Sequence, residues 1–155
     1  MNNFEMKRSA TIHASIEQVR SMINNLHAWE QWSPWQQLDP EMTQTYTGPE
    51  SGPGAQMHWV GNKKAGEGRM TVVHDTPTLV EVDIQFIKPF PAQNRSHFEL
   101  VSVGEHNEHT EVTWKMTGKQ SAFMKVMFKV MKMERSIGND FSRGLAALDA
   151  AVQQA

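Results

Sequence analysis

The sequence predicts an α+β fold in which a curved antiparallel sheet grips a long C-terminal helix. Residues 4–13 alternate between apolar and polar side chains, which is typical of a strand. The middle of the chain holds short alternating segments between Gly- and Pro-rich turns. Residues 123–152 repeat apolar side chains every three or four positions, which indicates a helix. The 155 residues are expected to form one domain, 1–155, because a chain of this size buries roughly 68–70% of its unfolded surface.

The first strand is predicted to be followed by short helical structure. A single charge, Arg8, interrupts the apolar face of residues 4–13. Ser15 is predicted to be a helix N-cap, because Gln18 three residues later completes a capping box. We expect this helix to end near Ser33, which precedes a proline.

Three tryptophans follow within seven residues, at Trp29, Trp32 and Trp35. Such a density is unusual for an exposed turn. Two interpretations are open: the tryptophans plug one end of the core, which we favour, or they line the entrance to a ligand site.

The middle of the chain predicts a series of strands. The segments with alternating polarity lie at residues 42–46, 55–59, 68–72, 80–86, 94–100 and 112–116. Val73 blurs the facing of one of them. Short connections favour antiparallel neighbours, and one apolar face on each strand predicts a sheet with one covered face and one wet face.

The C-terminal segment carries an apolar stripe about 80° wide on a helical wheel. Its members are Phe123, Met127, Val130, Ile137, Phe141, Leu145, Leu148 and Val152. One charge, Glu134, lies within the stripe. A helix over residues 119–154 would be roughly 54 Å long at ~1.5 Å per residue, so we expect a break before Lys125 or near Gly138.

Composition excludes several classes of function. The 15 basic and 17 acidic residues give a net charge of −2 with mixed signs, which predicts no nucleic-acid partner. No run of 18 apolar residues could span a membrane, and the start of the chain lacks the apolar core of a signal peptide, so we expect a cytoplasmic protein. There is no cysteine, which excludes disulfides, thiolate catalysis and cysteine-based zinc sites.

The motifs of common catalytic sites are also missing. The sequence has no G-x-S-x-G element and no phosphate-binding glycine loop. His106 and His109 are three residues apart in a predicted hairpin loop, and we interpret them as a solvated turn because no further metal ligand accompanies them. We therefore assign no catalytic residue, no metal and no cofactor. The oligomeric state is left open.

Two charged residues, Arg8 and Glu134, lie on otherwise apolar faces and need a separate explanation. A lone buried charge is costly, so such groups reach solvent, pair with one another or meet a ligand. The sequence favours the first outcome, with a strand-to-helix pair or a polar end of a ligand pocket as the alternatives.

Residues 12–19, Ile-His-Ala-Ser-Ile-Glu-Gln-Val, form a predicted strand-to-helix junction. Other distinctive segments are Trp32-Ser33-Pro34-Trp35, Tyr46-Thr47-Gly48-Pro49, Trp59-Val60-Gly61-Asn62, Thr110-Glu111-Val112-Thr113-Trp114 and Gly138-Asn139-Asp140-Phe141. In these segments the chain resembles the START-like (SRPBCC, helix-grip) superfamily, in its polyketide cyclase/dehydrase-like branch. The resemblance covers nearly the whole chain.

The resemblance implies a sheet that grips the helix around an internal, mostly apolar cavity. Members of the superfamily bind lipids, sterols, polyketides and aromatic compounds; some are cyclases or dehydratases, and some are co-chaperones. The leading expectation is a protein that binds a small apolar or aromatic molecule. The alternatives are an enzyme of the cyclase, dehydratase or isomerase type that uses the same pocket, and a protein-interaction module.

The predicted pocket lies between the sheet and the C-terminal helix. Its apolar lining combines inward-facing strand positions with the helix stripe: Trp59, Met70, Phe86, Phe98, Trp114, Met116 and Phe141. Its polar groups are Arg8, Asn94 and Glu134. A few polar groups in an apolar cleft are the usual arrangement of a small-molecule site.

Overall fold

The computed structural model describes residues 2–36, 39, 41–63, 65–88, 91–120 and 133–153, without the side chains of residues 2–4, 119–120 and 133–137. Of the predicted helical stripe, Phe123, Met127 and Val130 therefore lie outside the described residues. The same holds for the side chain of Ile137.

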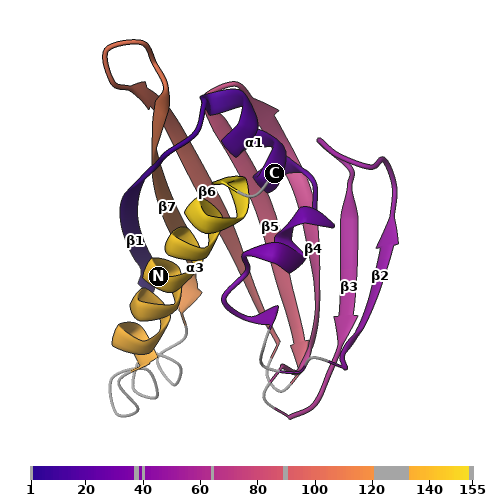
Figure 1. Cartoon of the computed structure of the whole chain (residues 1–155). Helices are drawn as coiled ribbons and strands as arrows, with labels where there is room; N and C mark the ends of the chain where they lie inside the picture. Colours follow the sequence, from indigo (N-terminus) through magenta and orange to yellow (C-terminus); the bar gives the residue numbers. More distant parts are fainter. Residues whose placement is uncertain are drawn as a thin grey trace.

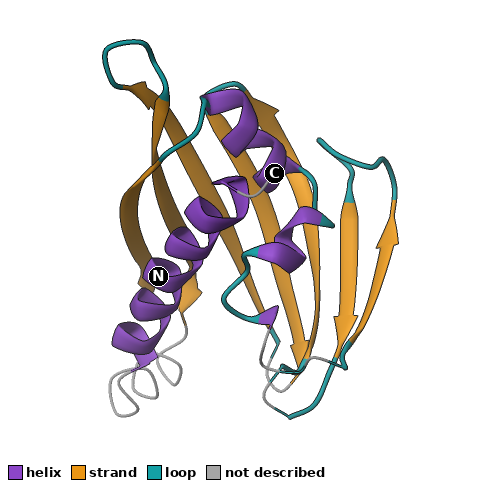
Figure 2. Cartoon of the chain, viewed as in Figure 1, coloured by secondary structure: helices purple, strands orange, loops and turns teal. Residues whose placement is uncertain are grey.

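Seven strands form one curved antiparallel sheet (Figures 1 and 2). Their order across the sheet is β1-β7-β6-β5-β4-β3-β2, so the first strand lies beside the last. Their bounds are β1 Asn2–Ile12, β2 Thr43–Thr47, β3 Gln56–Val60, β4 Glu67–Thr76, β5 Leu79–Lys88, β6 Ala92–Val103 and β7 His109–Gln120. The predicted α+β class and the curved antiparallel sheet are confirmed.

Within the described residues, three helical elements cover one face of this sheet: α1 (Ile16–Asn24), the short 3-10 helix η1 (Ala28–Gln31) and α3 (Met133–Gln153). The capping box is confirmed, because the Gln18 backbone N–H donates to Ser15 Oγ at 3.3 Å and the Ser15 N–H donates to Gln18 Oε1 at 3.2 Å. The helix does not reach Ser33 as we expected. It ends at Asn24, and Asn25 is extended, so the tryptophan segment forms a separate element.

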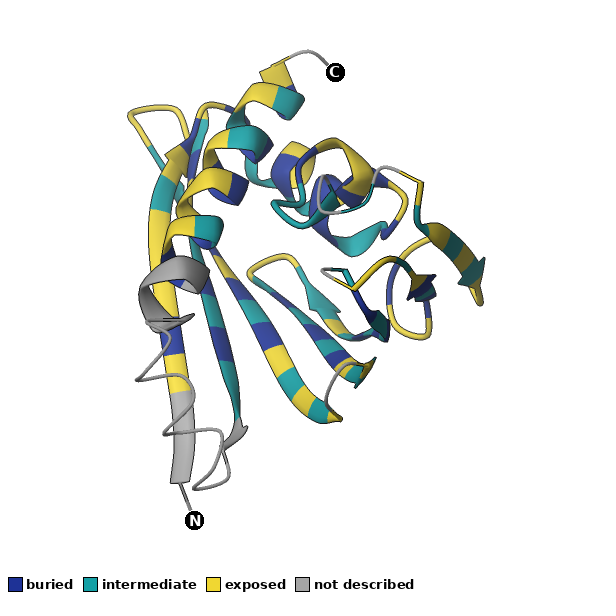
Figure 3. Ribbon diagram, turned by 90° about the horizontal axis from the view of Figure 1, so that it is seen from below, coloured by how far each residue is buried: buried dark blue, intermediate teal, exposed yellow. Residues whose placement is uncertain are grey.

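The strands bury one face and expose the other, as the alternation predicts (Figure 3). Val80, Val82 and Ile84 of β5 are fully or almost fully buried. On the outer face, His58 pairs with Glu67 at 2.9 Å and Arg95 pairs with Asp83 at 2.6 Å. The uncertain facing near Val73 has a physical cause, since the β4–β5 pairing shifts by one residue between Val72 and His74.

The C-terminal helix α3 packs chiefly against β1, with lesser contacts to α1 and η1. Phe141, Leu145, Leu148 and Val152 are buried, so the predicted stripe is the packed face. Of the two places where we expected a break, Gly138 is wrong, because α3 runs through that residue without interruption, and Lys125 lies outside the described residues. Within the part of the chain that the structure describes, no helix is both long and apolar enough to cross a membrane.

We predict that Phe141→Ala lowers the free energy of unfolding by about 3–5 kcal/mol, the usual range for a buried phenylalanine. Urea denaturation measures this loss. Val101→Ala is the matched control, because Val101 is 56% exposed on β6 and its truncation should change stability by less than about 0.5 kcal/mol. A loss below ~1 kcal/mol for Phe141→Ala would show that the stripe is not the core face.

Candidate functional site

The predicted lining residues separate into groups along the inner face of the sheet. Phe98, Trp114 and Phe141 form a stack that joins the sheet to α3. The Phe98 and Trp114 ring centroids are 5.0 Å apart, and the Trp114 and Phe141 rings are parallel within 1° at 4.1 Å. All three side chains are completely buried. The stack is anchored in the middle of the sheet, because Phe98 and Trp114 are paired positions of β6 and β7.

Three tryptophans from the segment around η1 enclose this stack. Trp29, Trp32 and Trp35 present their edges to Trp114 at centroid distances of 6.2, 5.7 and 5.6 Å. The Nε1–H groups of Trp29 and Trp32 each donate to a backbone carbonyl of α1 at 2.8 Å. These two residues are only 3% and 1% exposed, which confirms for them the interpretation as a core plug.

Trp114 is therefore in contact with five other aromatic rings of the protein. Its Nε1–H donates to Ser96 Oγ at 3.2 Å, and Ser96 is itself completely buried. A buried indole whose N–H is satisfied in this way is a core residue. That Phe98, Trp114 and Phe141 also line a ligand cavity stays a prediction.

A second aromatic group lies toward the other edge of the sheet. Trp59 and Phe86 meet edge to face at 5.9 Å, and Trp59 Nε1–H donates to the Ala65 carbonyl at 2.9 Å. Gly68 lies opposite Trp59, and a Cβ there would overlap the indole and lie 2.7 Å from the Gln85 carbonyl oxygen. The ring can therefore lie against β4 only because residue 68 is glycine.

Between the two aromatic groups, flexible apolar side chains form the inner face. We call this set the methionine band: Met6, Met57, Met70, Ile84 and Met116. Register places Met6 opposite Met116, Met57 opposite Met70, and Met70 opposite Ile84. All five are buried, with at most 6% exposure. Of these residues, sequence reasoning selected Met70 and Met116, and it missed the others because it favoured large rings.

Polar side chains of β6 connect the two halves of the methionine band. Ser96 pairs with Met116, and Asn94 pairs with Ile84. Asn94 is half-buried and has no hydrogen-bond partner for its amide among the described residues. The amide is thus a polar group on an otherwise apolar surface, as predicted from its position on the strand.

Of the two predicted charges, Arg8 lies apart from Asn94, because β7 separates β1 from β6. Arg8 projects from β1 toward α3, is exposed, and donates from Nη1 to the Lys7 carbonyl at 2.8 Å. Glu134 belongs to α3, and its side chain lies outside the described residues. The inward-facing side chains of β5, β6 and β7 beside the methionine band carry no ionisable group, so this surface offers apolar contact rather than acid–base chemistry.

Two open hollows lie on the surface of the described part, and the predicted residues line neither of them. One of about 270 Å³ is bordered by His27 and Tyr46, and one of about 640 Å³ lies at the β3–β4 turn beside Val60 and Lys88. The Tyr46 hydroxyl donates to Glu30 at 2.5 Å. Burial, reinforced by this bond, raises the pKa of Tyr46 well above its ordinary value. The hydroxyl therefore stays protonated, and its hydrogen bond links β2 to η1.

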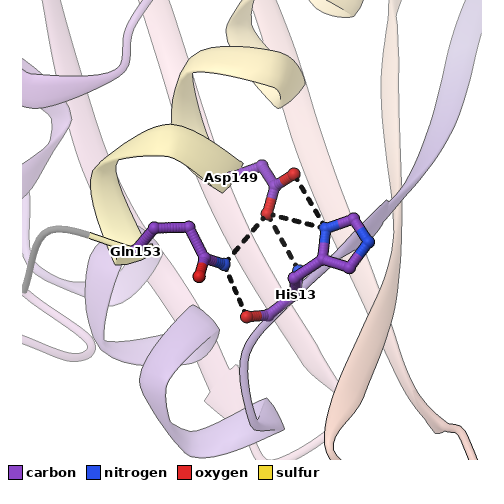
Figure 4. A network of polar contacts seen from close by, with 3 residues as sticks. All are labelled: His13, Asp149 and Gln153. Carbon is purple, nitrogen blue, oxygen red and sulfur yellow. Dashed lines mark hydrogen bonds and ion pairs between the residues drawn. The ribbon is translucent and has the colours of Figure 1, made fainter.

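A polar network that the sequence did not reveal fastens the end of α3 to the end of β1 (Figure 4). The backbone N–H of His13 donates to Asp149 Oδ1 at 2.9 Å, and His13 Nδ1 lies 3.0 Å from Asp149 Oδ2. Gln153 Nε2 donates to both the His13 carbonyl and Asp149 Oδ1. Residues 13 and 149 are 136 positions apart, so no local pattern could predict the contact.

The contacts of Asp149 shift its acidity. Burial alone would raise the pKa of this carboxyl, but hydrogen bonds from the His13 backbone and ring and from Gln153 outweigh that effect, so the pKa of Asp149 is lowered. The His13 ring also meets the His109 ring edge to face at 5.1 Å. In the described residues, no group of three or more His, Asp or Glu side chains could hold a metal ion.

Comparison with known proteins now decides the family. The family described as "Polyketide cyclase / dehydrase and lipid transport" matches residues 3–153. The chain belongs to this polyketide cyclase/dehydrase family. No curated protein matches the chain.

Solved structures agree with the fold of the polyketide cyclase/dehydrase family. A protein from Thermobifida fusca is 21% identical with a TM-score of 0.66, over 97% of this chain and 93% of that one. The Aha1 dimer from Colwellia psychrerythraea is 16% identical with a TM-score of 0.62, over 96% of each chain. A protein from Chromobacterium violaceum is 12% identical with a TM-score of 0.66, also over 96% of each. At these identities the similarity shows the fold alone.

We predict that Asp149→Asn lowers stability by about 1 kcal/mol at pH 7, because hydrogen bonds to a charged group are lost. A lowered folded-state pKa stabilises the protein above the unfolded value, near 3.9 for aspartate, and that stabilisation is lost as the pH falls through the folded value. Urea unfolding from pH 7 to pH 2.5 should show the difference from wild type shrinking below about pH 4. Glu111→Gln, an exposed carboxyl on β7, is the control. A difference independent of pH would rule out the charge of Asp149 as its cause.

We also predict that EDTA leaves the melting temperature unchanged, because the sequence lacks cysteine and the described residues show no metal-binding cluster. Differential scanning fluorimetry with and without the chelator checks this. A drop in melting temperature that zinc or calcium reverses would contradict it.

Proposed function

We propose that the protein binds a small apolar or aromatic molecule, lipid- or polyketide-like, between the methionine band and α3. The observation that carries the proposal is the composition of the inner face below the aromatic stack. Beside these flexible methionines, opposite Ile84, lies one half-buried amide, Asn94, that lacks a partner among the described residues. This is the usual make-up of a small-molecule site, apolar with few polar groups.

The arrangement of the helix also supports the proposal. Because α3 packs chiefly against β1, its main contact lies at one edge of the sheet. The band members on β3, β4 and β5 belong to the middle and far side of the sheet. Methionine side chains are unbranched and polarizable, so they adapt to ligands of different shape. The description of the family, which includes lipid transport, agrees with such a role.

Binding is better supported than catalysis. Acid–base chemistry needs an ionisable group within hydrogen-bond reach of the reacting atom. Among the described residues, the inward positions of β5, β6 and β7 beside the methionine band present apolar side chains, serine and asparagine instead, and the charge next to the band on β1 is the guanidinium of Arg8. We therefore propose a binding protein and assign no catalytic residue.

A neutral fluorescent probe, N-phenyl-1-naphthylamine, tests this proposal. We expect saturable binding with a Kd near 1 μM, worth about −8 kcal/mol. Met116→Ala and Ile84→Ala should each weaken it several-fold, because both remove apolar contact from the band. These variants replace Trp114→Ala, which would break the core stack.

Val101→Ala serves as the control for these titrations, since it makes an equally apolar truncation on the outer face of β6. Each variant is first shown by thermal melting to be folded at the assay temperature. The absence of saturable binding to wild type would overturn the proposal. Binding that both band variants leave unchanged would place the site elsewhere.

A further inference from the structure

Arg8 occupies an unusual position, a cation in an inward-facing row of β1. Its neighbours in that row are Met6 and Ala10, and its partner across the sheet is the completely buried Trp114. A charge among apolar groups is costly unless it reaches water or a partner. Arg8 reaches water, because its side chain is exposed, and its guanidinium lies against α3 at Gly138.

Gly138 of α3 makes room for this guanidinium. A Cβ on residue 138 would stand 2.8 Å from Arg8 Cζ and nearer still to Nη2, which is closer than any side chain allows. Glycine within a helix costs roughly 1 kcal/mol relative to alanine. At residue 138 the absence of a side chain leaves room for the Arg8 guanidinium against the helix backbone.

The guanidinium is also far from satisfied. It has five N–H donors, and among the described residues one of them is used, by Nη1 to the Lys7 carbonyl. In the described part of the chain no carboxylate lies within ion-pair distance of it, whereas Arg20, Arg95 and Arg143 each have an aspartate partner. The planar fork of arginine fits a carboxylate or phosphate with two parallel hydrogen bonds.

We propose that the ligand is an amphipathic anion, and that Arg8 binds its carboxylate-like head group where β1 meets α3. This proposal rests on the function proposed above. The apolar tail extends from Arg8 onto Met6 and Met116, the pair that lies one inward position further along β1 and β7. The head group remains near water, and the tail contacts the methionine band.

A matched pair of ligands tests the proposal: dodecanoate and dodecanol, which share a chain length and differ in charge. Each displaces N-phenyl-1-naphthylamine from wild-type protein and from variants. We expect Arg8→Gln to weaken dodecanoate binding about tenfold and to leave dodecanol and the probe unchanged. Arg8→Lys should retain part of the affinity, because the charge remains while the fork is lost.

Lys7→Gln is the control for charge. It removes the same charge one residue away, on the exposed face of β1, and should leave dodecanoate affinity within about twofold, because exposed charges are screened by salt. Gly138→Ala moves the guanidinium without removing it and should weaken dodecanoate selectively.

Three outcomes would overturn the proposal. Dodecanoate affinity that survives Arg8→Gln, or equal weakening of dodecanoate and dodecanol, would leave Arg8 without a role in head-group binding while the apolar site stands. If neither the neutral probe nor either ligand binds wild type, the function itself is wrong, and the head-group assignment is rejected with it.

Discussion

The parallel contact between Trp114 and Phe141 holds the C-terminal helix onto the sheet, and much of the interior is arranged around it. Phe98 extends the stack across β6, and the tryptophans around η1 contact Trp114 edge to face. Gly144 is part of the same arrangement, because a Cβ there would lie 3.0 Å from both Pro34 and the Trp114 ring. Each aromatic pair contributes about 0.5–1.5 kcal/mol beyond its burial, so the cluster fixes the position of α3 firmly.

The inner face of the sheet has two kinds of surface, one aromatic and one rich in methionine. Rigid rings with two side-chain torsions fill the region under η1, and methionines with three torsions fill the region beside it. A rigid cluster stabilises one arrangement of helix and sheet. A flexible one tolerates guests of different outline without moving the backbone. In the proposed function, stability and ligand adaptability would belong to different rows of the same strands.

The fold could be predicted from the sequence because facing is encoded in periodicity. The alternation of side chains in β5 and the apolar stripe through Phe141 each indicate which side of the element is buried. Periodicity does not state what covers it, and so Phe98 and Trp114, chosen as cavity lining, meet other rings of the protein. The contact of His13 with Asp149 was equally hidden, since it joins polar residues from opposite ends of the chain.

The behaviour of Arg8 shows the same limit at a single residue. The alternation of side chains in β1 places this charge on the apolar face, and that can be predicted from the local sequence. Its accommodation depends on a missing side chain at Gly138, which only the docking of α3 brings into contact. The tryptophan segment is similar, because the end of α1 at Asn24 follows from tertiary packing of Trp29 and Trp32 rather than from helix propensity.

The pairing of β1 with β7 affects the order in which the strands can pair during synthesis. Ser9 and Thr113 hydrogen bond across these strands at 2.8 Å although 104 residues separate them. At ~5–20 residues per second, β1 is synthesised about 5–20 s before β7, its neighbour in the described sheet. The strands β2–β6 pair with near neighbours in the sequence and can form during that interval. Until β7 is made, β1 must keep the apolar side of a long strand out of contact with other chains.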